Sequence, residues 1–74
     1  NMTCETEPFI HFVMTAHDFI KESDAEKEKL KKLDLLNKAM LLLDNAQSAG
    51  APPQTLKELR NLANNKFMEA VNNE

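Results

Sequence analysis

Apolar residues recur at helical spacing in three stretches of the chain, and no run of four to eight residues alternates as a strand would. This pattern predicts three helices, at about residues 7–22, 24–48 and 53–72, and therefore an all-α fold. The connections between them are short, which favours a small antiparallel three-helix bundle, or a helical hairpin that completes its core by dimerisation.

The first predicted helix begins at Thr6-Glu7-Pro8 and has an unusually wide apolar face. A step of 100° per residue places this face in an arc of roughly 220°, whereas a surface helix needs only about 100° or somewhat more. We expect the two other helices to cover it completely, or a partner to bind at its edges. The edge residues are Ile10 and Met14 on one side and Phe12 and Phe19 on the other.

The second predicted helix has recognisable signals at both ends. Ser23-Asp24-Ala25-Glu26 matches a capping box and predicts a start at about 24, and Gly50 followed by Pro52-Pro53 predicts the end. Such a helix would be about 37 Å long against about 24 Å for the first. We therefore expect its charged first half to project beyond the bundle or to be covered by something else.

Two sides of the second helix carry leucines. The larger apolar arc, over residues 35–46, predicts the core. On the opposite side Leu30, Leu33 and Leu41 gather around Asn37, a pattern typical of a seam in which Asn sets the register of paired helices. The alternative is that these are single surface leucines, which are common on folded proteins.

The third predicted helix opens at Pro53 and is amphipathic in the ordinary way. Leu56, Leu59, Leu62, Phe67 and Val71 fall within its apolar half. Several asparagines lower its intrinsic helicity, so its stability should depend on packing.

Composition limits the possible functions. A chain of 74 residues with 42% hydrophobic residues is expected to fold as one small domain, residues 1–74, with residues 1–6 as a flexible segment. Its net charge of −3 and single arginine argue against nucleic-acid binding, and no apolar run is long enough to span a membrane.

Candidate chemistry is sparse. Cys4, His11 and His17 are the only thiol or imidazole donors, and their spacing does not let them converge on one metal ion, so no metal site or other cofactor is expected. We expect His17, within the apolar arc, to be partly buried with a hydrogen-bond partner. Gly50 is the single glycine, which excludes a phosphate-binding loop, and the carboxylates lie on predicted solvated faces. No enzymatic activity is expected.

Cys4 is the single cysteine and permits two interpretations: a reduced thiol inside the cell, which we favour, or one half of an intermolecular disulfide. Asn1 precedes a Met and is interpreted as an expression scar. In length, helicity and a Cys before Phe9-Ile10 the chain resembles the secretoglobins, whose dimers enclose an apolar cavity. It lacks a second Cys near the C-terminus and matches no further motif, so it is not assigned to that family.

These observations favour a non-enzymatic module that binds a protein partner or a second copy of itself through apolar helix faces. The expected contact residues are Ile10, Phe12, Met14, Phe19, Leu30, Leu33, Asn37 and Leu41. A secreted carrier of a small apolar ligand, dimerised through Cys4, is the first alternative. A structural spacer excised from a larger protein is the second.

Overall fold

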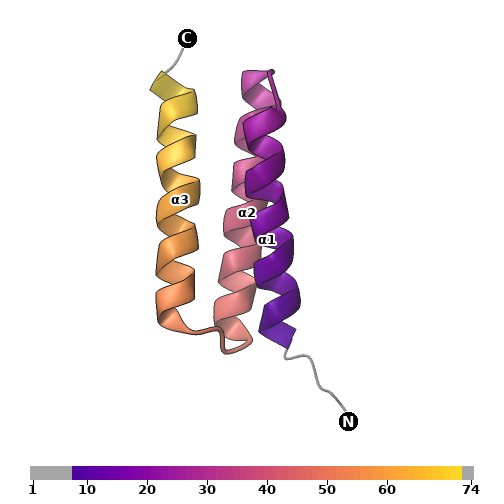
Figure 1. Ribbon diagram of the computed structural model, residues 1–74, viewed down its shortest axis with the longest axis vertical. Helices are drawn as coiled ribbons and strands as arrows, with labels where there is room; N and C mark the ends of the chain where they lie inside the picture. The colour runs from indigo at the N-terminus through magenta and orange to yellow at the C-terminus, as the bar shows by residue number, and fades with distance from the viewer. Residues whose placement is uncertain (1–7, 73–74) are drawn as a thin grey trace.

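The computed structural model describes residues 8–72, which form three α-helices and no strand. They are α1 (Pro8–Ala25), α2 (Lys29–Ser48) and α3 (Pro53–Asn72). Figure 1 shows that α1 and α3 run in one direction and α2 runs back between them in the chain. The all-α antiparallel three-helix bundle predicted from the sequence is confirmed.

The central element of the bundle is α2. It packs extensively against α1 and also against α3, whereas α1 and α3 touch each other at few points. In Figure 1, α1 lies in front of α2 along most of its length, and α3 stands to one side of the pair. The fold is therefore a close α1–α2 hairpin with α3 attached to it mainly through α2.

The turn between α1 and α2 differs from the prediction. Ser23 is not a cap of α2: it lies in the last turns of α1, and its hydroxyl donates to the carbonyl oxygen of Ile20 at 2.6 Å. The carboxylate of Glu26 accepts the backbone N–H of Glu28 at 3.2 Å within the turn. The predicted capping box is wrong because the Ser23 hydroxyl is buried and bonded within its own helix, where it cannot reach the start of α2.

This shift removes the expected difference in helix length. With α1 continuing to Ala25 and α2 beginning at Lys29, the two helices have 18 and 20 residues. At 1.5 Å per residue they are about 27 and 30 Å long. The first part of α2 therefore does not project beyond a shorter α1.

The turn between α2 and α3 follows the prediction. Gly50 has φ of +96°, a conformation that glycine adopts without steric cost. Its N–H donates to the Gln47 carbonyl at 3.1 Å, and that of Ala51 donates to the Ala46 carbonyl at 2.9 Å. These two bonds form a Schellman motif, in which buried Ala46 and Ala51 supply the apolar contact. Pro53 then opens α3, as its fixed φ allows.

The centre of the bundle is built largely from small side chains. Of residues 8–72, ten apolar ones are buried, and six of these are alanines. The four larger ones are Ile20 of α1, Leu36 and Leu43 of α2 and Leu56 of α3. Small residues at the contacts allow helix axes to approach closely, since the interaxial distance depends on the side chains between them.

Larger apolar side chains surround this centre and are only partly buried. Phe9, Phe12, Val13 and Phe19 of α1 pack against the buried cluster in this way, as do two residues each of α2 and α3. The three phenylalanines of α1 thus form a rim around the core. Most of the wide apolar face of α1 is accounted for by contacts within the chain.

Polar contacts attach α3 to the hairpin. Arg60 Nη2 donates to Asp44 Oδ1 at 2.7 Å and to Gln47 Oε1 at 2.9 Å, both on α2. Lys66 Nζ lies 2.7 Å from Asp24 Oδ1 of α1. Because these side chains are partly exposed, such ion pairs contribute about 1 kcal/mol or less each.

Replacing Leu43 with Ala tests the assignment of the core. Leu43 is fully buried, so its truncation should lower the free energy of unfolding by about 2–5 kcal/mol. Leu41, two positions away and 63% exposed, is the matched control, and Leu41→Ala should change this free energy by about 0.5 kcal/mol or less. Urea denaturation followed by circular dichroism measures both. Equal losses would show that α2 does not pack through the Leu43 side.

Hydrogen exchange tests the weaker attachment of α3. We expect backbone amides around Ala63 to exchange about 10-fold faster than those around Leu36, because α3 contacts the hairpin mainly on one side. Native-state exchange measured by NMR gives both rates. Equal protection in the two helices would show instead that the bundle opens as a single unit.

Candidate interaction surface

The predicted seam on α2 lies on the side of the helix that faces away from the core. The term α2 stripe is used here for Leu30, Leu33, Asn37 and Leu41. Leu30 is 79% exposed and Leu41 is 63% exposed, Asn37 is exposed as well, and Leu33 is half-buried. Two large apolar side chains therefore stand in solvent on α2, with a polar side chain between them.

Helix geometry explains why none of residues 8–72 covers the two leucines at the ends of the α2 stripe. At 100° per residue, Leu41 lies about 160° around the helix from buried Ala39. The side of α2 that receives α3 is marked by Asp44, which binds Arg60, and by Lys29, whose Nζ donates to the Val71 carbonyl at 3.3 Å. Asp44 lies only about 20° around the helix from Asn37, so the α2 stripe overlaps this edge at half-buried Leu33 and extends beyond it to Leu30 and Leu41. Both of these leucines stay exposed beside the neighbouring helices.

The predicted contact residues of α1 are distributed differently. Phe12 and Phe19 pack against the buried cluster, and Ile10 is half-buried. Met14 is 63% exposed and lies about 120° around α1 from buried Ile20. Of the four residues proposed on this helix, Met14 alone presents most of its side chain to solvent.

Met14 and the α2 stripe do not form one surface. The two helices pack against each other through the faces that carry Ile20 and Leu36, and both Met14 and Leu41 lie on the far sides of their helices. The structure therefore divides the eight predicted contact residues into two separate regions. The α2 stripe is the larger of the two in exposed apolar side chains.

The prediction for His17 is wrong. It was expected to be partly buried with a hydrogen-bond partner, but its side chain is exposed. It lies about 80° from Phe9 on the helical wheel, inside the predicted apolar arc but toward the edge at Met14, which is also exposed. The other imidazole, of His11, lies edge-on to the Phe12 ring with centroids 6.2 Å apart.

Three exposed apolar residues of α3 were not predicted as surface. Leu62 is 39%, Met68 50% and Val71 40% exposed. The sequence placed Leu62 and Val71 in the buried half of this helix, and both lie at the margins of that arc. The signal that could have identified these three residues as exposed is their angular distance on the helical wheel from Ala63 and Ala70, which are buried.

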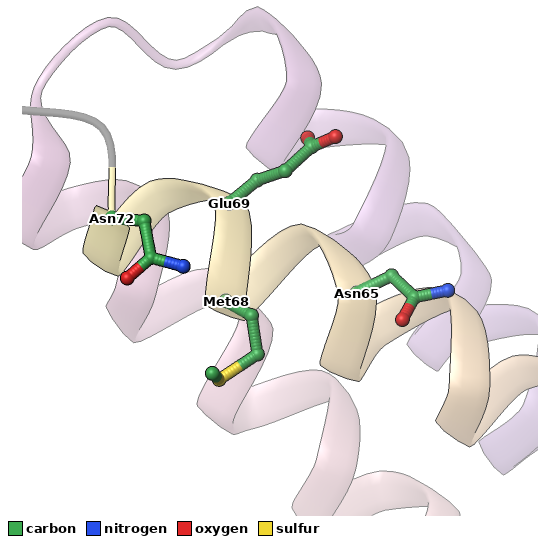
Figure 2. A pocket seen from close by; sticks show the side chains of 4 residues that line it. All are labelled: Asn65, Met68, Glu69 and Asn72. Atoms are coloured by element: carbon green, nitrogen blue, oxygen red, sulfur yellow. The ribbon is translucent and has the colours of Figure 1, made fainter.

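A shallow depression on α3 surrounds Met68. It is lined by Asn65, Met68, Glu69 and Asn72, all from one helix. Figure 2 shows their side chains fanning out in different directions from consecutive turns. With walls from a single helix and three polar residues of four, it does not enclose an apolar ligand.

Ionisable groups do not converge on a reactive centre in the part of the chain that the structure describes. No group of three or more His, Cys, Asp or Glu side chains in residues 8–72 is arranged to hold a metal ion. None of the three described helices is long and apolar enough to cross a membrane, as the sequence predicted. Cys4, the predicted start of α1 at Thr6-Glu7 and the N-terminal segment lie outside the described residues.

Comparisons of the chain with models of protein families, with curated proteins and with solved structures found no match. The arrangement of the described residues is therefore the basis for interpreting the α2 stripe.

The double substitution of Leu30 and Leu41 by Glu tests whether the α2 stripe is surface. Both side chains are mostly exposed, so the helicity of the chain should be unchanged and each substitution should alter the free energy of unfolding by about 0.5 kcal/mol or less. Circular dichroism and urea denaturation provide the measurements. The matched control is Leu36→Glu, which places a charge at a fully buried position and should unfold the chain. Loss of fold in the double variant would show that these leucines belong to the core.

Proposed function

We propose that the chain is a non-enzymatic protein-interaction module that docks a partner helix or a second copy of itself. The observation that carries this proposal is the exposure of Leu30 and Leu41 on one side of α2, on either side of Asn37. Full burial of a leucine side chain is worth about 1.5–3 kcal/mol, so covering both would supply a substantial part of a binding energy.

The proposed mode is the packing of one amphipathic helix against another. Residues three and four apart on the partner would contact Leu30 and Leu41, and their burial would supply the affinity. Charged pairs border the α2 stripe: Lys38 Nζ lies 3.2 Å from Asp34 Oδ2, and Lys31 Nζ lies 3.9 Å from Glu28 Oε2. Such exposed charges would contribute to orientation and specificity more than to affinity.

The α1 edge is a secondary part of the proposal. Met14 is exposed and flexible, and a methionine adapts to differently shaped apolar partners. Because it lies on another side of the bundle, it would serve a separate contact. Phe12, Phe19 and Ile10 are only partly buried and would contribute through the parts of their side chains that solvent reaches.

The two alternatives remain predictions. A carrier of an apolar ligand, joined through Cys4, predicts a chain that doubles in mass without reductant and a lipid that co-purifies with it. A structural spacer predicts no binding at the α2 stripe. Neither alternative explains why two leucines on one face of the central helix stay in solvent, and the interaction module does.

Site-specific photo-crosslinking in cells that express the chain tests the proposal. Benzoylphenylalanine replaces Leu30 in one variant, Leu41 in a second and Glu58, an exposed residue of α3, in a control. We expect a discrete crosslinked adduct from positions 30 and 41. Its yield from position 58 should be at least about 10-fold lower, because a covering partner excludes water at the α2 stripe and not elsewhere. The mass of the adduct tells a second copy from another protein.

A further substitution makes the photo-crosslinking test specific to the stripe. Adding Leu41→Glu to the variant with the photoreactive residue at position 30 should remove the adduct. If adducts from positions 30 and 41 are absent, or no stronger than from position 58, the proposed function is wrong.

A further inference from the structure

We infer that the partner of the α2 stripe is a second copy of this chain, bound with the two α2 helices antiparallel. This inference rests on the proposed function and names the occupant of the same surface. The order of side chains along the outward side of α2 supports it. Four exposed residues are spaced by four, three and four along the helix: Leu30, Asp34, Asn37 and Leu41.

This spacing is that of a seam between two paired helices. Positions that alternate by three and four residues remain on one side of a helix and face a partner continuously. A wholly apolar partner helix would leave the Asn37 amide, and the Asp34 oxygen that Lys38 does not approach, without hydrogen-bond partners, which is costly once they are buried. The polar centre of this seam, Asp34 and Asn37, therefore favours a partner with matching polar groups.

An antiparallel second copy supplies these groups. When Leu30 lies opposite the second copy's Leu41, Asp34 lies opposite the second copy's Asn37, since the positions in each pair sum to 71. The Asn37 amide can then donate to the Asp34 carboxylate of the other chain, and two-fold symmetry repeats both pairs. The seam so formed has leucine pairs at its two ends and two Asp–Asn hydrogen bonds at its centre.

The backbone dipoles favour the antiparallel arrangement. Antiparallel helices bring the positive end of one backbone dipole to the negative end of the other. In a parallel pair, Asp34 would instead lie opposite Asp34 of the second copy, and the two carboxylates would repel each other.

The contact is small, so the dimer should dissociate on dilution. From Leu30 to Leu41 the seam measures about 17 Å, at 1.5 Å per residue. One helix face per chain buries less than the roughly 800 Å² per partner of a standard stable interface. We therefore expect a weak, reversible dimer whose population rises with protein concentration.

Disulfide trapping between purified variants tests the register directly. All proteins carry Cys4→Ser, which removes the single natural thiol. Leu30→Cys and Leu41→Cys are mixed in equal amounts under mild oxidation, with one variant isotopically labelled so that mass spectrometry separates the products. We expect the mixed disulfide to form at least about 10-fold faster than either symmetric one, because a disulfide needs Cα atoms within about 7 Å.

Matched controls separate the possible outcomes. Lys57→Cys and Asn65→Cys place thiols at exposed positions of α3 outside the seam, and their mixed disulfide should form at the slow rate of random collisions. A predominance of the symmetric Leu30→Cys product would indicate a parallel pair and overturn the inference. Rates equal to those of the α3 controls would overturn it as well.

Sedimentation equilibrium over a wide concentration range, on the Cys4→Ser protein, provides the second measurement. A monomer–dimer equilibrium is expected, and Leu30→Glu together with Leu41→Glu should shift it to monomer. A monomer at all concentrations excludes the second copy as occupant. In that case an adduct with a different protein from position 30 in the photo-crosslinking experiment would still support the proposed function, so the two failures are distinguishable.

Discussion

Leu36, Ala39, Leu43 and Ala46 of α2 are fully buried, in a cluster that joins all three helices. The other two helices scarcely touch each other, so the bundle is held together through this one side of α2. Alternation of leucine and alanine lets neighbouring helices approach closely and still fill the space between them. The fold depends on this packing, because a chain of 74 residues has little other apolar surface to bury.

The composition of the core explains the appearance of the surface. Because alanines occupy much of the centre, the phenylalanines of α1 lie at the edge of the core. Phe12 and Phe19 pack against the buried cluster on one side and are exposed to solvent on the other. Among residues 8–72, the same constraint leaves the far side of α2 without a neighbouring helix, since α1 and α3 contact this helix on its buried side and at one edge. Exposed leucines on a central helix follow from this geometry, and the proposed interaction rests on them.

The sequence predicted a helix end correctly where backbone conformation determines that end, and wrongly where side-chain packing determines it. Gly50 adopts a positive φ that other residues disfavour, and the prolines after it stop the helix, so local chemistry alone ends α2. Ser23 matched the start of a helix equally well by its local sequence. Its side chain is buried against the bundle instead, and α1 continues beyond it because burial there outweighs the cap.

The sequence by itself determined the fold class, the end of α2 with the start of α3, and the core side of α2, because each follows from helical periodicity or from the backbone preferences of Gly and Pro. It also singled out Leu30, Asn37 and Leu41 as residues that the core does not need. Only the tertiary structure decided which margin of each apolar arc is covered. Phe12 and Phe19 became part of the rim, whereas His17, Leu62 and Val71 remained in solvent. A helical wheel gives the direction of a side chain, but the position of the neighbouring helix decides whether that side chain is buried.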